Sequence, residues 1–270
     1  MLSASAFHEL LASQNVSRYA GVPDSLLKDF CAFISDHVAA DRHVITANEG
    51  SAVGLAAGSF LGSGELTAVY LQNSGLGNTV NPLTSLADPM VYGVPMILII
   101  GWRGQPGRHD EPQHVKMGGV TVGLLDALDV PYAVLPDTPS EAEAVVRSAV
   151  TTAVERACPF ALVIPKGTFE PYALQSAADN SLPLSREEAI AAFVEGLPPE
   201  ALVVSTTGKP SRELFEVREA RGEGHDGDFL TVGSMGHASQ IALGVAMSQP
   251  NRPVYCLDGD GAALMHMGGL

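Results

Sequence analysis

Short apolar runs without polar alternation recur along this chain, separated by longer segments rich in alanine. Such runs are typical of strands covered on both faces, whereas the alanine-rich segments favour helices. The runs of the first part are Val44–Ala47, Leu66–Gln72, Pro95–Gly101, Tyr132–Leu135 and Phe160–Pro165. The helices predicted around them are Ala4–Gln14, Ser25–Val38, Glu49–Leu61, Val120–Leu128 and Glu141–Arg156. This alternation predicts an α/β fold built on a parallel sheet.

A second block of the same kind follows a segment that loses the pattern. Residues Gly167–Leu184 collect proline, serine, asparagine and aspartate, which predicts a linker. Ser185 and Glu188 then have the spacing of a capping box that opens a helix. Strands are predicted at Ala201–Thr206, Phe229–Val232 and Pro253–Leu257, with helices at Ser211–Glu219 and Gln240–Ser248. We therefore expect two doubly wound parallel-sheet domains, residues 1–166 and 185–270. The second is shorter than a usual domain of ~100–150 residues, so we expect it to be truncated at its carboxyl end.

The net charge and the cysteine content limit which binding partners and which cellular compartment are expected. The chain has 30 acidic and 15 basic residues, and its formal charge of −15 argues against nucleic acid, whose phosphates call for a basic surface. The longest aliphatic run, residues 96–100, is too short to cross a bilayer, and the amino terminus lacks the pattern of a signal peptide. Three scattered cysteines speak against a disulfide framework. These features predict a cytoplasmic protein that binds neither membrane nor nucleic acid.

An acidic residue, Glu49, stands where a strand passes into a helix, and the sequence leaves two interpretations open. In the structural one, Asn48 caps the helix and Glu49 complements its dipole. In the functional one, Glu49 is a carboxylate at the carboxyl edge of a parallel sheet, where α/β proteins bind ligands. The helix carries a glycine at every fourth position, namely Gly50, Gly54, Gly58 and Gly62. This stripe predicts a close approach to the helix, either by the sheet or by another subunit.

Three further glycine-rich turns follow predicted strands. In the turn Gln72–Asn78, glycines let backbone N–H groups face a ligand at the start of a helix. Asp260 lies between two glycines in Leu257–Ala262, which suits either a divalent cation that also holds phosphate oxygens or a plain Asp-Gly turn. The turn Gly233–His237 follows the preceding strand. Because neighbouring parallel strands end at one edge, the last two turns are expected to face one crevice.

In this order, the glutamate, the Ser-Gly-x-Gly turn, the Gly-Ser-Met-Gly turn and the Gly-Asp-Gly turn resemble the thiamine-diphosphate-dependent 2-oxoacid decarboxylases. Four strings are similar, more narrowly, to phosphonopyruvate decarboxylases: Gly21–Lys28, Gln72–Asn81, Gly101–Gly104 and Asp110–His114. The resemblance runs from about Ala6 to Leu270. It implies a pyrimidine-binding domain followed by a diphosphate-binding domain. The metal motif of the family continues to an asparagine that lies beyond residue 270.

The resemblance also implies roles for single residues. Glu49 would hydrogen-bond the aminopyrimidine ring of thiamine diphosphate, Met235 would keep the cofactor bent, and the Gly233 carbonyl would receive the pyrimidine amino group. Asp260 would bind the Mg²⁺ that bridges the diphosphate. The other implied cofactor contacts are Ser74, Gly75, Gly77, Asn78, Thr207, Gly208, Ser234, Gly259, Gly261 and Ala262.

The implied reaction converts 3-phosphonopyruvate, a small 2-oxoacid phosphonate, to phosphonoacetaldehyde and CO₂. The implied proton-transfer residues are Asp24, Ser25, His114 and His237. Cationic residues of one loop are candidates to attract the phosphonate: Arg103, Arg108, His109 and Lys116. The family arrangement implies a homo-oligomer in which Glu49 and Asp260 of different subunits meet in active sites at the subunit interfaces. Sulfopyruvate decarboxylation, or a non-catalytic binding module on the same scaffold, remains open.

Overall fold

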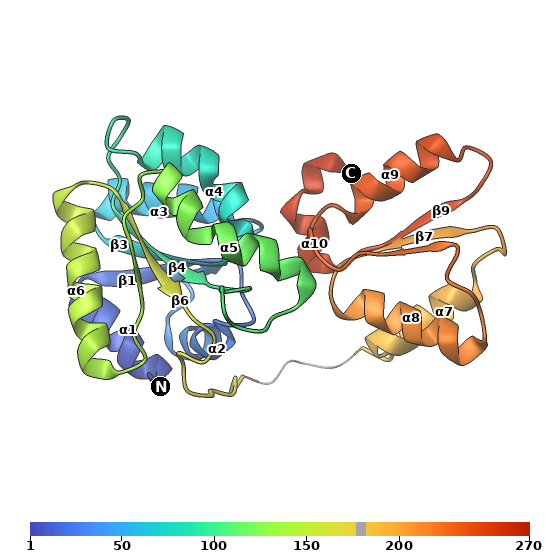
Figure 1. Ribbon diagram of the computed structural model, residues 1–270, viewed down its shortest axis with the longest axis horizontal. Coiled ribbons are helices and arrows are strands. Elements are labelled where there is room, and N and C mark those ends of the chain that lie inside the picture. The colour runs from blue at the N-terminus through green and yellow to red at the C-terminus, as the bar shows by residue number, and fades with distance from the viewer. Residues whose placement is uncertain (177–181) are drawn as a thin grey trace. The chain divides into compact units, whose positions relative to one another are not determined.

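The computed structural model describes residues 1–176 and 182–270. The chain divides into two compact units, Met1–Ala177 and Ala178–Leu270, which are described separately. Figure 1 labels their helices and strands. Within the described residues, no helix combines the length and apolar character that crossing a membrane requires.

The first unit is built on a six-stranded parallel sheet with the order β2-β1-β3-β4-β6-β5. Its strands are β1 (Val16–Gly21), β2 (His43–Ile45), β3 (Leu66–Gln72), β4 (Met96–Gly101), β5 (Tyr132–Val134) and β6 (Pro159–Ile164). Its α-helices are α1 (Ala4–Ser13), α2 (Lys28–His37), α3 (Glu49–Ser63), α4 (Leu76–Pro82), α5 (Pro112–Ala127) and α6 (Pro139–Glu155). The strand order reverses between β1 and β3, which makes their carboxyl ends the topological switch point of the sheet.

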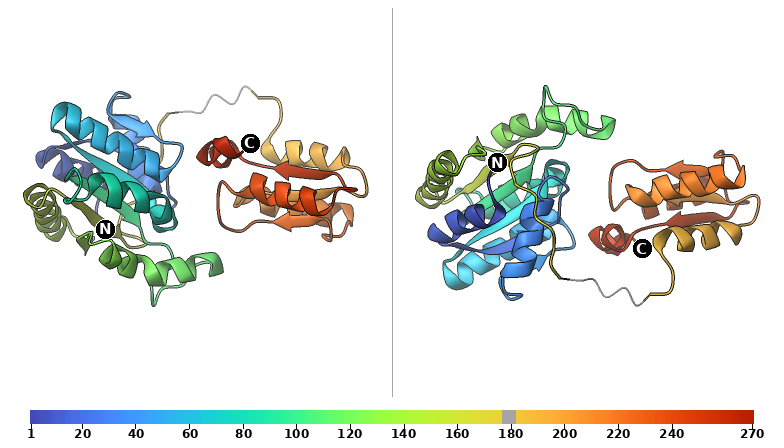
Figure 2. Two further views of the ribbon diagram at one scale, coloured as in Figure 1. Left: turned by 90° about the horizontal axis from the view of Figure 1, so that it is seen from above. Right: turned by 90° about the horizontal axis from the view of Figure 1, so that it is seen from below.

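Two apolar cores cover the two faces of this sheet, and Figure 2 shows helices on both sides of it. Successive side chains of a strand point to opposite faces. Tyr70 and Ile99 therefore join one core with Phe7 of α1. Val69 and Ile100 join the other core, which α3, α4 and α5 contribute to. Burial on both faces explains why β3 and β4 are apolar almost throughout.

The predicted doubly wound fold is confirmed, with differences in single elements. Strand β1 and helix α4 were not predicted. Helix α5 begins at Pro112, eight residues before the predicted start at Val120, and α2 begins at Lys28 instead of Ser25. The residues between β1 and α2, which include Asp24 and Ser25, therefore form a turn where the start of the helix was predicted.

The second unit contains a three-stranded parallel sheet with the order β8-β7-β9. Its strands are β7 (Leu202–Ser205), β8 (Asp228–Leu230) and β9 (Val254–Leu257), and its α-helices are α7 (Arg186–Glu195), α8 (Lys209–Arg221), α9 (Ala238–Ser248) and α10 (Asp260–Met265). Helices α7 and α8 pack on one face and α9 on the other, so this short unit is also doubly wound. The predicted capping box is confirmed: Ser185 Oγ accepts from Glu188 N, and Glu188 Oε2 accepts from Ser185 N.

The first part of the predicted linker, through Gln175, packs on the helices of the first unit. The Phe169 ring lies 5.3 Å from that of Phe7 and 5.6 Å from that of Phe30, centroid to centroid. Tyr172 N donates to Asp29 Oδ1 at 2.9 Å, and Gln175 N donates to Asp36 Oδ2 at 2.8 Å. Residues 177–181 of the same predicted linker lie outside the described residues.

Candidate functional site

The carboxylate of Glu49 lies at the carboxyl edge of the first sheet, just after β2. Asn48 caps α3 by accepting from Ser51 N at 2.9 Å, so the predicted cap is present. Glu49 is the first residue of the helix and is only 4% exposed. Its Oε2 accepts a hydrogen bond from Nδ2 of Asn78, an exposed residue of α4, at 2.7 Å. Both sequence interpretations thus describe this residue: it opens a capped helix, and it also lies at the ligand-binding edge of the sheet.

Gly75 makes room for this carboxylate, and Gly50 lets α3 approach α4 closely. A Cβ atom at Gly75 would lie 2.2 Å from Glu49 Oε1, and a Cβ atom at Gly50 would lie 2.7 Å from the carbonyl oxygen of Asn78. A Cβ atom at Gly77 would meet no atom within 4 Å. The Gln72–Asn78 turn therefore contacts Glu49 through Gly75 and Asn78. The sequence identified the turn but carried no signal that these two residues would face that acid.

Asp24 occupies the turn after β1. Its Oδ2 accepts from Leu26 N at 3.0 Å, whereas Oδ1 is buried and has no hydrogen-bond partner among the described residues. Burial raises the pKa of this carboxyl above its usual range, against the opposing effect of the Leu26 hydrogen bond and the Arg103 charge. Gly101 leaves the space that Asp24 fills, since a Cβ atom there would lie 2.1 Å from Oδ2. The arrangement favours a protonated acid at this edge.

Arg103 follows β4 and is engaged by neighbouring side chains. Its Nε donates to Asp110 Oδ2 at 2.9 Å and its Nη2 to Asp110 Oδ1 at 2.6 Å. Its Nη1 donates to Ser25 Oγ at 2.7 Å. The guanidinium holds the pKa of Asp110 well below its usual range. Arg103 therefore fastens the loop to the Asp24–Ser25 turn in this structure.

The other cationic candidates make fewer side-chain contacts than Arg103 does. Arg108 Nη1 donates to the carbonyl oxygen of Lys166 at 3.0 Å. His114 is half-buried in α5, and burial, together with the Arg103 charge, lowers its pKa. The side chains of His109, in the loop, and Lys116, in α5, form no hydrogen bond or ion pair within the described part of the chain. Arg103 is thus fixed by several side-chain partners, whereas the side chains of His109 and Lys116 are not held by such contacts.

Sequence reasoning missed Asn73, which links two strand ends. Asn73 is fully buried, and its Nδ2 donates to the Arg103 carbonyl at 2.8 Å and to Thr121 Oγ1 at 2.9 Å. Its Oδ1 accepts from Arg103 N at 3.2 Å. A buried amide with all these partners is a positioning residue for the loop. Its place directly after a strand was the signal that could have identified it.

The second unit brings a separate group of candidates to the carboxyl edge of its own sheet. Thr207 and Gly208 follow β7, Gly233, Ser234 and Met235 follow β8, and Gly259, Asp260, Gly261 and Ala262 follow β9. The latter two turns touch, because a Cβ atom at Gly261 would lie 3.2 Å from Met235 Cε. His237 Nδ1 lies 3.1 Å from Ser234 Oγ. The predicted convergence of the two turns is therefore present.

Asp260 is the only one of the predicted site residues proposed as a metal ligand. It is exposed and begins the short helix α10. Over residues 1–176 and 182–270, no three His, Cys, Asp or Glu side chains gather in a way that could hold a metal ion. The turn carries two carboxylates, Asp258 and Asp260, and Asp258 Oδ1 accepts a hydrogen bond from Gly259 N at 3.0 Å.

Comparison with known proteins places this geometry in a family. Residues 1–122 match the model of the thiamine pyrophosphate enzyme, N-terminal TPP binding domain, and residues 207–270 match that of the C-terminal TPP binding domain. A phosphonopyruvate decarboxylase of Streptomyces hygroscopicus is 40% identical over 100% of this chain and 69% of its own. The chain belongs to the thiamine pyrophosphate (thiamine diphosphate) enzymes.

Two further relatives from this family differ in their degree of similarity. A phosphonopyruvate decarboxylase of Streptomyces viridochromogenes is 38% identical over 100% of this chain and 69% of its own. A sulfopyruvate decarboxylase of Methanosarcina acetivorans is 26% identical over 96% of this chain and 68% of its own. The phosphonopyruvate decarboxylases and this sulfopyruvate decarboxylase therefore match nearly the whole chain, at different degrees of identity.

Proposed function

We propose that this protein catalyses the thiamine-diphosphate- and Mg²⁺-dependent decarboxylation of 3-phosphonopyruvate to phosphonoacetaldehyde and CO₂, as a cytoplasmic carboxy-lyase. The observation that carries the proposal is the similarity of the whole chain to phosphonopyruvate decarboxylases, at 40% and 38% identity. The sulfopyruvate decarboxylase compared above reaches 26%. A non-catalytic module would have little use for a buried acid at this edge of the sheet, where Glu49 lies.

The residues present fit the cofactor. Gly75 leaves the space that the Glu49 carboxylate fills, so the acid is held at the edge where the cofactor would bind. Within the described residues, Oε1 of Glu49 accepts no hydrogen bond from a side chain or backbone group, so it retains acceptor capacity. Glu49, Ser74, Gly75, Gly77 and Asn78 would hold the pyrimidine half. The Gly233 carbonyl would receive the pyrimidine amino group, and Met235 would keep the cofactor bent. The remaining proposed contacts come from Thr207, Gly208, Ser234, Gly259, Gly261 and Ala262.

Loss of CO₂ from a 2-oxoacid leaves an electron pair that no protein side chain accepts well. Bound thiamine diphosphate supplies a thiazolium ring that takes up this pair. Glu49 would hold a proton at its carboxylate facing the aminopyrimidine. Asp24, whose raised pKa favours the protonated form, would present a proton at the same sheet edge, and Ser25 lies beside it. His114 and His237 are the other proposed proton-transfer groups.

The metal proposal rests on Asp260. Its carboxylate follows β9 in a Gly-Asp-Gly turn, and hard oxygen donors of this kind suit Mg²⁺. Mg²⁺ usually keeps waters and binds through one or two protein carboxylates plus phosphate oxygens, so a single ligand from this turn, Asp260, is compatible with the role.

The substrate assignment is tested by assaying phosphonopyruvate, sulfopyruvate and pyruvate side by side, with thiamine diphosphate and Mg²⁺ added. We expect kcat/KM to be highest for phosphonopyruvate. A preference for sulfopyruvate would replace the substrate but keep the reaction. No CO₂ release from any of the three acids, by a chain that binds thiamine diphosphate, would favour the binding-module alternative.

A further inference from the structure

The guanidinium of Arg103 lies at the carboxyl edge of the first sheet, next to the Asp24–Ser25 turn. Arg103 follows β4, and its side chain is 17% exposed, so a ligand can reach it although it is not loose on the surface. Its Nη1 donates to Ser25 Oγ at 2.7 Å. Ser25 follows β1, and β3 lies between β1 and β4 in the sheet. The contact therefore joins two strand ends at the edge where α/β proteins bind ligands.

Both the backbone and the side chain of Arg103 are held in place. The buried amide of Asn73 accepts from Arg103 N and donates to the Arg103 carbonyl oxygen. Asp110 binds Nε and Nη2 of the guanidinium through its two carboxylate oxygens. A binding group that is fixed before its ligand arrives loses little conformational entropy on binding. Arg103 is therefore preorganised to receive a ligand at this edge.

The guanidinium keeps free hydrogen-bond donors despite these contacts. Each of its terminal nitrogens carries two N–H groups. Within residues 1–176 and 182–270, Nη1 donates once, to Ser25, and Nη2 donates once, to Asp110, so one N–H of each nitrogen has no partner. Ser25 is exposed, and its hydroxyl oxygen accepts from Arg103, which leaves its own O–H free to donate. Donors from two strand ends thus stand together.

The charged side chains around this guanidinium include more cations than acids. Asp110 and Glu111 are the acids, and burial favours the uncharged form of Asp24. Arg108 Nη1 donates to the carbonyl oxygen of Lys166 at 3.0 Å, and Lys166 follows β6, the strand that pairs with β4. Neither Arg108 nor Lys166 forms an ion pair within the described residues. The ends of β4 and β6 therefore favour an anion, although the whole chain carries a formal charge of −15.

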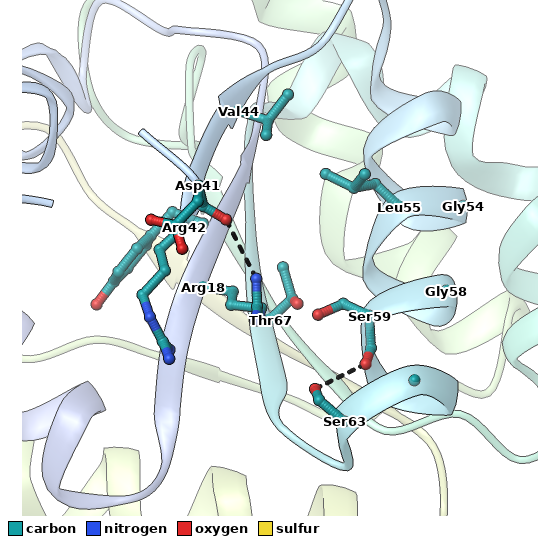
Figure 3. Close-up of a pocket in the computed structure, with 12 residues that line it drawn as sticks. Arg18, Asp41, Arg42, Val44, Gly54, Leu55, Gly58, Ser59, Ser63 and Thr67 are labelled. Carbon is teal, nitrogen blue, oxygen red and sulfur yellow. Dashed lines mark hydrogen bonds between the residues drawn. The ribbon is translucent and has the colours of Figure 1, made fainter. Parts of the chain in front are cut away.

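Another pair of arginines lies toward the amino ends of the strands. Figure 3 shows Arg18 and Arg42 beside a pocket that α3 also lines. Arg42 precedes β2, and both guanidinium groups bind Glu65. Within the described residues the sheet does not approach α3 there, since a Cβ atom would meet nothing within 4 Å at Gly54, Gly58 or Gly62. Arg103 is thus the arginine that the structure brings to the Asp24–Ser25 turn.

We propose that Arg103 and Ser25 bind the phosphonate group of the substrate and thereby set the preference for a 2-oxoacid with an anionic head group over pyruvate. Guanidinium N–H groups pair well with the oxygens of tetrahedral anions, and the Ser25 O–H adds a donor for a further oxygen. A sulfonate presents the same arrangement of oxygens, so the shared chemistry is that of a tetrahedral oxyanion. The inference rests on the proposed decarboxylation and names the residues that select its substrate.

The ratio of kcat/KM for phosphonopyruvate to kcat/KM for pyruvate, measured with thiamine diphosphate and Mg²⁺ present, tests the proposal. Arg103→Lys keeps the charge beside Asp110 but loses the planar set of N–H groups. It is expected to lower the ratio by at least about tenfold, chiefly by raising KM for phosphonopyruvate. Ser25→Ala should lower the ratio in the same direction. Arg147→Lys, on the exposed face of α6, is the matched control and keeps the wild-type ratio.

Isothermal titration calorimetry of the full chain with thiamine diphosphate and Mg²⁺ gives a second readout that does not depend on turnover. The probe is 3-phosphonopropionate, which has the head group and the carboxylate of the substrate but no 2-oxo group. It is expected to bind saturably to the wild type and at least about tenfold more weakly to Arg103→Lys, whose circular dichroism spectrum is unchanged. Butyrate, which has a methyl group in place of the phosphonate, is expected to bind the two proteins equally.

An unchanged ratio in Arg103→Lys, or equal losses for both acids, would overturn the proposal, because Arg103 would then only hold the loop or bind the carboxylate that both acids share. Equal losses in Ser25→Ala would assign Ser25 to proton transfer instead. If the wild type prefers sulfopyruvate, the head group is a sulfonate, and Arg103→Lys must lower the ratio of sulfopyruvate to pyruvate. A wild type that releases no CO₂ would contradict the proposed function, and equal affinity of wild type and Arg103→Lys for 3-phosphonopropionate would then overturn this inference separately.

Discussion

The carboxylate of Glu49 and the α-carbon of Gly75 lie so close that no side chain fits between them. An added Cβ atom would stand 2.2 Å from Oε1. Gly75→Ala must therefore move the carboxylate, and displacements of about 1 Å at a reacting group cost on the order of 100-fold in rate. We predict that kcat/KM for decarboxylation falls by about that factor while the circular dichroism spectrum is unchanged. Gly123→Ala, in a helix with open space around it, is the matched control. Wild-type kinetics in Gly75→Ala would contradict the proposed position of Glu49.

The raised pKa of Asp24 leads to a prediction about how the stability of the protein depends on pH. Burial raises its pKa above the unfolded value of 3.8, so the folded chain holds the proton more tightly than the unfolded chain does. This contribution to stability is present below that value and is lost as the pH rises through the folded pKa. An asparagine side chain cannot ionise, so Asp24→Asn is expected to raise the midpoint of thermal unfolding at pH 7. The difference should close as the pH is lowered toward about 4. A variant less stable than the wild type at pH 7 would show that Asp24 is ionised and stabilising there.

At the scale of elements, the connection between β4 and α5 depends on one carboxylate. Asp110 binds the Arg103 guanidinium and accepts from the backbone N–H groups of Gly104 at 2.7 Å and Glu111 at 2.8 Å. Asp110→Asn is expected to lower the free energy of unfolding by about 2 kcal/mol at pH 7, measured by urea titration. Because the folded pKa of Asp110 is depressed, its contribution is present above the unfolded value of 3.8 and is lost as the pH falls through the folded pKa.

The control for Asp110→Asn is Glu111→Gln. Glu111 is a neighbouring exposed acid whose side chain makes no capping hydrogen bond to α5. That variant should unfold as the wild type does. Equal stability of Asp110→Asn and the wild type at pH 7 would mean that the loop is held by other contacts, such as those of Asn73.

The sequence predicted those elements whose burial leaves a strong pattern. Strand β3 is apolar nearly throughout and has the predicted bounds Leu66–Gln72. Strand β1 was missed because Ser17 and Arg18, which are only half-buried, interrupt its apolar pattern. The early start of α5 was missed because Gly118 and Gly119 weaken the local helix signal. A Cβ atom at Gly118 would lie 1.7 Å from the Gly104 carbonyl oxygen. Tertiary packing therefore requires a glycine at this position of the helix.

The residues of the candidate site likewise divide into those that a sequence pattern can predict and those that it cannot. Residues after strand ends, such as Glu49 and Asp24, could be identified because a parallel sheet brings its carboxyl ends to one edge. Pairings across that edge, such as Arg103 with Ser25 and Asp110, depend on loop conformation and left no periodic signal. The cationic loop therefore looked free in the sequence, whereas Arg103 is bound to its neighbours in the structure.

At the scale of the whole molecule, we predict a homo-oligomer in which Glu49 of one subunit and Asp260 of another serve the same active site. Mixing the inactive variants Glu49→Gln and Asp260→Asn under exchange conditions tests this. A mixed dimer then contains one site with both acids intact, so random exchange restores about a quarter of wild-type decarboxylation. No activity in the mixture, with exchange shown by native mass spectrometry, would place both acids in sites formed by single chains.

The central claim is that the Glu49 carboxylate acts in thiamine-diphosphate-dependent decarboxylation. The most direct measurement compares CO₂ release from phosphonopyruvate by the wild type, Glu49→Gln and Glu111→Gln, with thiamine diphosphate and Mg²⁺ present. We predict that Glu49→Gln lowers kcat by about 100- to 10,000-fold, the range for loss of an acid–base group, and that Glu111→Gln leaves it unchanged. Unchanged turnover in Glu49→Gln would contradict the account.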